Sequence, residues 1–210
     1  MLEFFPFPLL GGLGILIIIL ILLWRKRSPA YLLCFSVFWL YLLLGVSLTI
    51  FPMPLPETIV NRSPVNYILL RVNLVPFNFG GLFDNPPSVI FKEIFGNILL
   101  TVPFGFGIPF LAPFKPKNLP WLAIGAGLVV ETAQLGISLL IGGLYRSVDI
   151  NDVLLNAAGV LLGYALFRGF AWLYVAISDR IKIKQSGLFA YLYEVALYNR
   201  GMHAVSSKSQ

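Results

Sequence analysis

Residues 4–24 read FFPFPLLGGLGILIIILILLW, an apolar run without a charge, and Arg25-Lys26-Arg27 follows it directly. At about 1.5 Å of rise per residue, a helix of this length can cross the hydrocarbon core of a bilayer. A secretory signal carries its positive charges before the apolar stretch, whereas this chain carries them after it. The run therefore predicts a first membrane-spanning helix with the N-terminus outside.

The composition of the whole chain supports a membrane protein. Of its 210 residues, 58% are hydrophobic and 11% are charged, and the mean hydropathy is +0.86. A soluble domain is near half apolar and a quarter charged, and a single globule of this size could not hide so much apolar surface. A soluble enzyme, a nucleic-acid module, a disordered regulator and a disulfide scaffold all fit poorly. The predicted fold class is all-α, a polytopic membrane helix bundle with about five spanning helices.

Further apolar runs give the other spans of this bundle. We expect spanning helices at about 28–50, 89–114, 119–141 and 153–177. The stretch 52–88 contains several prolines and charges and is too polar to span cleanly, so we expect an outer loop with an interfacial or re-entrant piece.

The basic residues determine the expected orientation. The net charge is +6, but these residues form short clusters between apolar runs, which indicates positive-inside placement rather than a nucleic-acid partner. With five spans and the N-terminus outside, most of them fall inside: Arg25, Lys26, Arg27, Lys115, Lys117, Arg180, Lys182 and Lys184. Those outside or near the outer face are Arg62, Arg71, Lys92 and Arg146. We therefore predict that the N-terminus is outside and the C-terminus inside.

These features divide the chain into three parts. Residues 1–56 hold two N-terminal spans, residues 57–178 hold the outer loop and three spans, and residues 179–210 hold a cytoplasmic interfacial helix and a tail. The interfacial helix is expected over 187–198, where apolar residues approximate one helical face. Cys34 is the only cysteine and His203 the only histidine, so no metal site is predicted.

Two polar residues in the fourth predicted span need an explanation, because polar groups inside a bilayer are costly. Glu131 and Gln134 are three residues apart and share one helical face. Glu131 lies roughly 15 Å below the outer end of its span by helical rise. A carboxylate at that depth must be protonated, paired or facing a wet cavity. Arg146 is the nearest cation along the chain, so a structural ion pair is the alternative to a functional role.

A second polar stripe follows at steps of three, three and four residues, which is one helical face if the helix starts early. Its members are Arg146, Asp149, Asp152 and Asn156. Asp149 is a good N-cap and Asp152 would lie in the first turn, so a purely structural role stays open for both. Gly159 and Gly163 continue the stripe as a close-packing signature between spanning helices. In the third span, Asn97 is expected to satisfy backbone groups released by a kink at Pro103.

The chain resembles the VanZ-like family of bacterial membrane proteins, named for a member associated with teicoplanin resistance. The resemblance rests on short pieces in a fixed order: Asn73-Leu74-Val75-Pro76-Phe77, Asn97-Ile98-Leu99-Leu100, Pro103-Phe104-Gly105, Glu131-x-x-Gln134 and Arg146-x-x-Asp149-x-x-Asp152-x-x-x-Asn156-x-x-Gly159. It implies a multi-pass protein of the bacterial cytoplasmic membrane, linked in some members to glycopeptide or lipoglycopeptide susceptibility. It supplies no mechanism.

The first functional hypothesis is a non-catalytic factor that binds an envelope lipid or an amphipathic antibiotic in a polar pocket at the outer face. Arg146 would meet a phosphate or carboxylate, and removing it should weaken binding without affecting folding. Neutral polar side chains would hydrogen-bond the headgroup. The predicted ligand-binding residues are Asn73, Asn97, Glu131, Gln134, Arg146, Asp149, Asp152 and Asn156.

Two other functions stay open. In an intramembrane enzyme acting on a lipid-linked substrate, Glu131 would be a general acid or base, and Asp149 and Asp152 would hold a divalent cation, the one cofactor considered. Against it, the sequence has no Ser–His or Cys–His set. In a small transporter, Glu131 would be proton-coupled, but five spans without an internal repeat fit poorly unless the protein dimerises.

Overall fold

The computed structural model describes residues 7–51, 64–113, 115–143, 148–182 and 185–200, and within these ranges every regular element is helical. Four helices are long and apolar enough to cross a membrane: α2 (Pro29–Ile50), α4 (Pro87–Gly107), α5 (Leu119–Ile141) and α6 (Ile150–Ile181). Three are shorter: α1 (Phe7–Leu23), α3 (Val65–Leu70) and α7 (Gly187–Asn199). The predicted tail with His203 lies outside the described residues, as do Arg62, Arg146 and Lys184.

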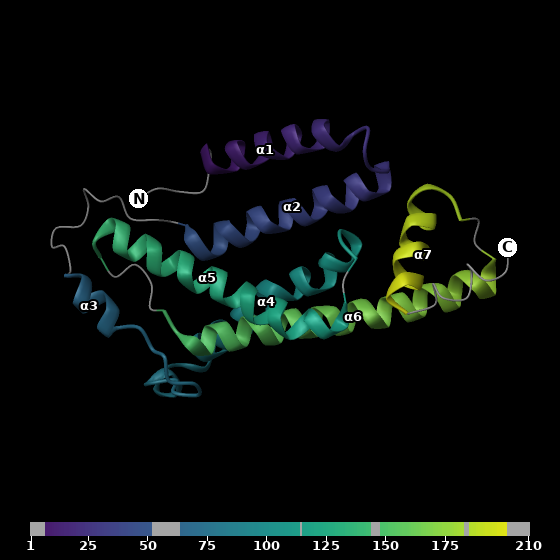
Figure 1. Ribbon diagram of the computed structural model, residues 1–210. Coiled ribbons are helices and arrows are strands. Elements are labelled where there is room, and N and C mark those ends of the chain that lie inside the picture. The colour runs from purple at the N-terminus through teal and green to yellow at the C-terminus, as the bar shows by residue number, and fades with distance from the viewer. Residues whose placement is uncertain (1–6, 52–63, 114, 144–147, 183–184, 201–210) are drawn as a thin grey trace.

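The predicted fold class, an all-α polytopic membrane bundle, is confirmed, with differences at the helix ends. The first predicted span corresponds to α1, which has 17 residues and pairs with α2 (Figure 1). Seventeen residues are the lower limit for crossing a bilayer, so α1 as a fifth span stays a prediction. The third span was expected to reach residue 114, but α4 ends at Gly107 and continues as a 3₁₀ turn, Ile108–Phe110. The fifth span was expected over 153–177, whereas α6 covers Ile150–Ile181.

Local sequence explains where the helices begin and end. At the start of α2, the Ser28 hydroxyl accepts a hydrogen bond from the Tyr31 amide, and Pro29 occupies the first turn, where its missing N–H costs nothing. Helix α5 ends at Gly142, whose φ of 68° is left-handed and favours glycine. Helix α6 begins early because Asp149 caps it, as its side chain accepts from the Asn151 amide.

The centre of the bundle is the pair α4 and α6, which pack with their backbones unusually close. An ideal Cβ built on Gly105 of α4 would lie 2.0 Å from the carbonyl oxygen of Val160. On α6, a Cβ on Gly163 would lie 2.0 Å from the carbonyl oxygen of Val102. Only glycine permits these approaches, so the close-packing role predicted for the α6 stripe is confirmed. Helix α5 covers another side of α6, and α2 lies over α4 and α5.

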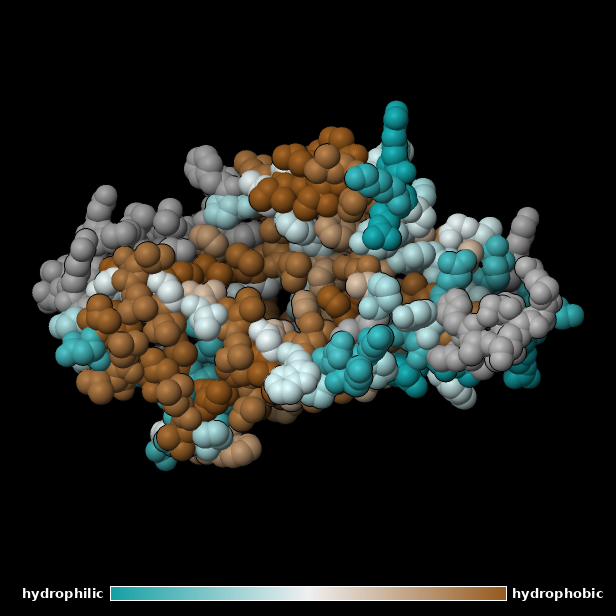
Figure 2. Space-filling view, viewed as in Figure 1, coloured by the Kyte–Doolittle hydropathy of each residue, from teal (hydrophilic) through white to brown (hydrophobic). Residues whose placement is uncertain are grey.

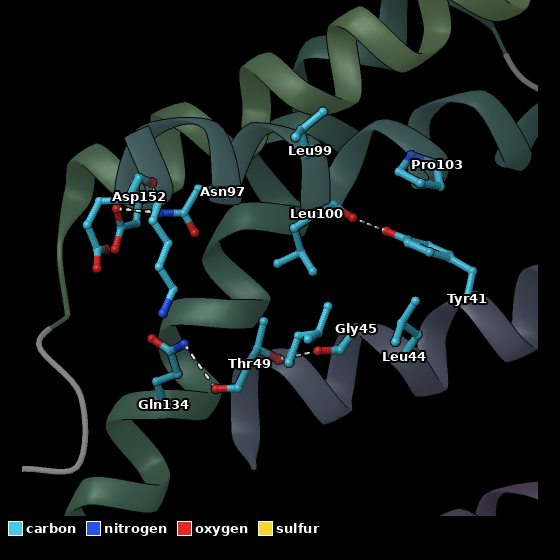
Figure 3. A pocket seen from close by; sticks show the side chains of 14 residues that line it. Tyr41, Leu44, Gly45, Thr49, Asn97, Leu99, Leu100, Pro103, Gln134 and Asp152 are labelled. Carbon is cyan, nitrogen blue, oxygen red and sulfur yellow. Dashed lines mark hydrogen bonds between the residues drawn. The ribbon is translucent and has the colours of Figure 1, made fainter. Parts of the chain in front are cut away.

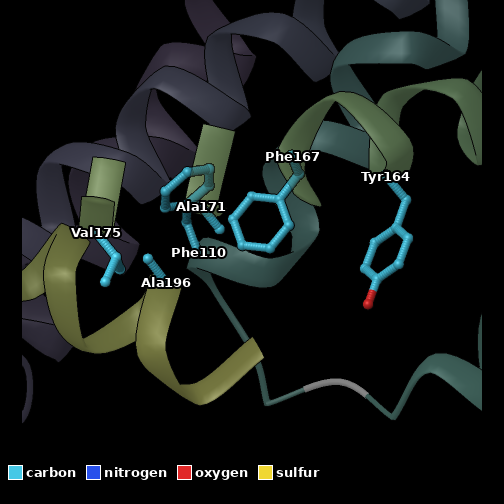
Figure 4. Packing of buried hydrophobic residues seen from close by; sticks show 6 residues of the cluster. All are labelled: Phe110, Tyr164, Phe167, Ala171, Val175 and Ala196. Atoms are coloured by element: carbon cyan, nitrogen blue, oxygen red, sulfur yellow. The ribbon is translucent and has the colours of Figure 1, made fainter. Parts of the chain in front are cut away.

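Helix α7 folds back onto the C-terminal half of α6 (Figure 4). Its Ala196 joins a buried apolar cluster with the 3₁₀ turn after α4 and with α6, made of Phe110, Tyr164, Phe167, Ala171, Val175 and Ala196. Arg168 of α6 also donates to the carbonyl of Asn199 at 2.9 Å. The predicted helix therefore exists, and one of its faces is occupied by protein. Its location at a membrane surface stays a prediction.

The basic clusters lie at one end of the bundle. The α1–α2 turn with its three basic residues, the α4–α5 connection and the C-terminal end of α6 all point the same way (Figure 1). Tyr31 at the start of α2 contacts Tyr191 of α7, and the Tyr191 hydroxyl donates to the Phe110 carbonyl, so these segments meet. Figure 2 shows teal side chains near this turn and towards the α7 end, with brown surface over much of α1 and over the opposite half of the molecule. This arrangement supports the predicted orientation.

The orientation can be tested by cysteine labelling in a Cys34→Ser background. Ser88 at the start of α4 and Lys117 in the α4–α5 connection are both exposed and lie at opposite ends of the bundle. We expect a membrane-impermeant maleimide to label a Ser88→Cys protein in intact cells, and a Lys117→Cys protein only after permeabilisation. The reverse pattern would place the N-terminus inside.

Candidate functional site

The outer loop is fixed to the first turn of α6 through Asn73. The Asn73 amide donates to the Val148 carbonyl at 2.9 Å, and the Ile150 amide donates to the Asn73 carbonyl at 2.9 Å. This forms an isolated parallel bridge between Asn73 and Asp149. The Asn73 side-chain amide adds bonds to Asp149 Oδ1 at 2.9 Å and to the Asn78 carbonyl at 2.8 Å. Two predicted site residues thus meet, and their contact holds the loop.

Asn151 is a second attachment point for the loop. Its side chain is buried, with Oδ1 accepting from the Phe77 amide at 2.6 Å and Nδ2 donating to the Asn78 carbonyl at 2.8 Å. Phe77 has a φ of 63°, a left-handed conformation that is unfavourable for a bulky side chain. Such a conformation persists where surrounding bonds impose it, which the Asn151 contact does here.

Glu131 also binds the backbone at the start of α6. Its side chain is 3% exposed, and its Oε2 accepts from the Asp149 backbone amide at 3.1 Å. A carboxylate at a helix N-terminus satisfies a free backbone donor and complements the helix dipole. Asp149 is the N-cap, as the structural interpretation predicted. Arg146 is among the residues that the structure does not describe, so its pairing with Glu131 stays a prediction.

Asn97 and Asp152 join α4 to α6. Asn97 Nδ2 donates to Asp152 Oδ1 at 2.8 Å and to the Glu93 carbonyl at 3.0 Å. Asn97 therefore does not satisfy the backbone group released by Pro103, because the carbonyl that loses its N–H there belongs to Leu99, whereas the Asn97 side chain bonds to Asp152 and to the Glu93 carbonyl. One turn before Pro103, the Tyr41 hydroxyl of α2 donates to the Leu100 carbonyl at 2.8 Å.

Asn156 lies one turn after Asp152 on α6 but, among the described residues, its side chain forms no hydrogen bond to another predicted site residue. Its side chain is fully buried where α6 faces α4, and its carbonyl accepts from the Thr101 hydroxyl at 2.6 Å. Within the described part of the chain, neither side-chain amide atom has a hydrogen-bond partner. It lines none of the cavities described below.

A cavity of about 620 Å³ lies between α2 and α4, with Gln134 and Asp152 on its far side (Figure 3). Gln134 Nε2 donates to the Thr49 carbonyl at 3.4 Å, closing one corner. The polar side chains that line this polar cavity are Tyr41, Thr49, Lys92, Glu93, Asn97, Gln134 and Asp152. Its apolar lining is Leu44, Leu48, Leu99, Leu100 and Pro103. It therefore offers both hydrogen-bonding groups and hydrocarbon walls.

A second cavity, of about 540 Å³, lies between α2 and α5 and is almost wholly apolar. We call it the apolar groove; it includes Val46, Trp121, Leu122 and Val129. It shares part of its wall with the polar cavity, namely Tyr41, Gly45, Thr49 and Leu100. Helix α2 thus lies between a cavity of mixed polarity and an apolar one.

A third and smaller cavity, of about 300 Å³, lies beneath the outer loop. Asp149, Asn151 and Leu82 line it, and Glu93 and Asp152 line both it and the polar cavity. The charges of Asp149 and Glu93 both act on the Asp152 carboxylate. In the described residues, no group of three or more His, Cys, Asp or Glu side chains is placed to hold a metal ion.

Comparison with models of protein families places the chain. The model of the VanZ/LLP1 family matches residues 38–174, which is more than half of the chain and includes every residue that lines the polar cavity. The chain belongs to the VanZ/LLP1 family. Comparison of this VanZ-like membrane protein with curated proteins and with solved structures gave no match. Helices α1 and α7 lie outside the matched range.

Several residues that line the polar cavity of this VanZ-like protein were not predicted. Lys92 and Glu93 resemble ordinary charges at the end of a span, although Glu93 and Asn97 are four residues apart and share a helical face. Tyr41 and Thr49 repeat at a spacing of four around Gly45, which is a polar face on an otherwise apolar helix. This spacing of four residues could have indicated that one face of the helix lines a polar site.

Proposed function

We propose that this VanZ-like protein is a non-catalytic cell-envelope factor of the bacterial cytoplasmic membrane. It binds a lipid or an amphipathic glycopeptide at the outer face, and this binding underlies teicoplanin and lipoglycopeptide resistance. The observation that carries the proposal is the shared wall between the polar cavity and the apolar groove.

An amphipathic ligand matches the two cavities. Its polar head would bond to the amide, hydroxyl and charged groups of the polar cavity, and its chain would occupy the apolar groove. Both volumes fall in the range of small-molecule sites. Three residues that line the polar cavity, Lys92, Glu93 and Asp152, lie at the starts of α4 and α6, away from the basic clusters, which is the outer side under the predicted orientation.

Binding is favoured over catalysis because two of the three proposed catalytic carboxylates hold the backbone. Asp149 caps α6 and bonds to Asn73, and Glu131 accepts the Asp149 amide. Removing the charge of either group would therefore destabilise the first turn of α6, whether or not a substrate is bound. Of the three, Asp152 alone lines the polar cavity.

A Gly45→Leu substitution should block the site. Gly45 lines both hollows, and a Cβ added there meets nothing within 4 Å, so leucine would grow into the cavities without displacing a neighbour. We expect ligand binding about tenfold weaker or worse, because the leucine side chain would occupy space that the ligand needs; a tenfold loss corresponds to about 1.4 kcal/mol. The measurement is drug susceptibility to teicoplanin and a lipoglycopeptide, beside vancomycin, in a deletion host complemented with each variant.

The matched control is Gly14→Leu. Gly14 lies on α1, also has nothing within 4 Å of an added Cβ, and lines none of the cavities described here. It should behave as wild type at equal membrane levels. A Gly45→Leu protein that still protects against the lipidated drugs as well as wild type would refute the proposed site.

A further inference from the structure

The wall between the polar cavity and the small cavity beneath the loop consists of two carboxylates. Glu93 of α4 and Asp152 of α6 both line both spaces. In the part of the chain that the structure describes, neither carboxylate is paired with a Lys or Arg nitrogen, and the bond from Asn97 is neutral. Asp149 adds a further negative charge nearby. Carboxylates so arranged repel one another unless a cation or a proton lies among them.

The lining of the polar cavity also includes a positively charged side chain. Lys92 lines the polar cavity next in sequence to Glu93, and within the described residues it forms no salt bridge. Among the residues that the structure describes, the polar cavity therefore presents one positive group and two negative groups to whatever occupies it. This is the complement of a headgroup that carries a phosphate and an ammonium.

We infer that the polar cavity takes a phospholipid headgroup with a primary ammonium, of the phosphatidylethanolamine class. Its ammonium lies against Glu93 and Asp152, its phosphate lies against Lys92, and one acyl chain lies in the apolar groove. The ammonium supplies the positive charge that the two carboxylates require and donates charge-assisted hydrogen bonds to them. This inference rests on the proposed function, because it uses the same cavities.

The experiment compares two phospholipids that differ in headgroup charge. Phosphatidylethanolamine and phosphatidylglycerol with identical acyl chains are offered at equal concentration to the purified full chain in detergent, and bound lipid is counted by native mass spectrometry. We expect phosphatidylethanolamine to bind about fivefold more tightly, as one charge-assisted contact at a partly exposed site would give. Equal binding of the two lipids would overturn the inference.

Charge variants separate the two ends of the headgroup. Glu93→Gln should weaken phosphatidylethanolamine binding about fivefold and leave phosphatidylglycerol binding unchanged, whereas Lys92→Met should weaken both. Glu93 and Lys92 are exposed, so neither change should affect folding. Glu194→Gln on α7 is the control, because it removes an exposed negative charge far from the cavity. If Glu93→Gln and Glu194→Gln bound both lipids alike, the headgroup assignment would be wrong.

The Gly45→Leu protein distinguishes failure of this inference from failure of the proposed function. If it loses both lipids while wild type shows no headgroup preference, the cavities bind lipid and the ammonium assignment alone is wrong. If it binds both lipids as wild type does, the cavities are not the lipid site, and the inference falls with the proposed site.

Discussion

A Gly159→Val protein is expected to lose more than about 3 kcal/mol of stability and to be depleted from the membrane. A Cβ at this position would lie 2.1 Å from the Ile98 carbonyl oxygen and 2.2 Å from Thr101 Oγ1. The first of these atoms belongs to the backbone of α4 and cannot rotate away. The second is fixed by its own bond to the Asn156 carbonyl. The two helices would therefore have to separate, and the bundle depends on their contact.

The matched control for this prediction is Gly169→Val on the same helix. A Cβ there meets nothing within 4 Å, so both variants carry the same change in helix propensity and only one carries the clash. Fluorescence-detected size exclusion after a temperature series gives the apparent Tm of each. A Gly159→Val protein as stable as the Gly169→Val protein would mean that α4 and α6 do not approach as closely as described.

The helices could be predicted from sequence because each depends on features that are local. The apolar runs, the Ser28 and Asp149 caps and the Gly142 stop all act within a turn of the residue concerned. The glycine stripe was also readable, because residues four apart must share one helical face. The start of α6 was placed too late, at 153, since hydropathy ignores the polar first turn that a capped helix can carry.

The site was only partly predictable, because its contacts join segments far apart in the sequence. The pairs Asn73–Asp149 and Asn97–Asp152 unite predicted residues, yet nothing local assigns the partners. Asn151 lies off the polar stripe, so its side chain was not singled out. Lys92 and Glu93 become lining residues of a cavity only because α2 packs opposite them and forms the other wall. Local pattern shows which residues are costly in a membrane, and tertiary structure shows what they face.

An Asn151→Ala protein should release the outer loop while the bundle remains folded. The substitution removes the acceptor of the Phe77 amide and the donor to the Asn78 carbonyl, and both backbone groups then lack these partners. Losing two such bonds costs about 2–4 kcal/mol. The effect should be local, because the buried contacts between α4 and α6 are untouched and the left-handed backbone at Phe77 loses the bond that imposes it.

Hydrogen–deuterium exchange is the measurement that separates this local opening from global unfolding. We expect the amides of Phe77 and Asn73, which are bonded to Asn151 and Val148, to exchange about a hundredfold faster in the variant. The amides within α4 and α6 should keep their protection. Asn66→Ala is the control, since among the described residues its side chain bonds to the next amide alone, that of Tyr67. The loop lies over the carboxylates of the small cavity. Unchanged exchange of these amides in the Asn151→Ala protein would mean that Asn151 does not hold the loop in place over this cavity.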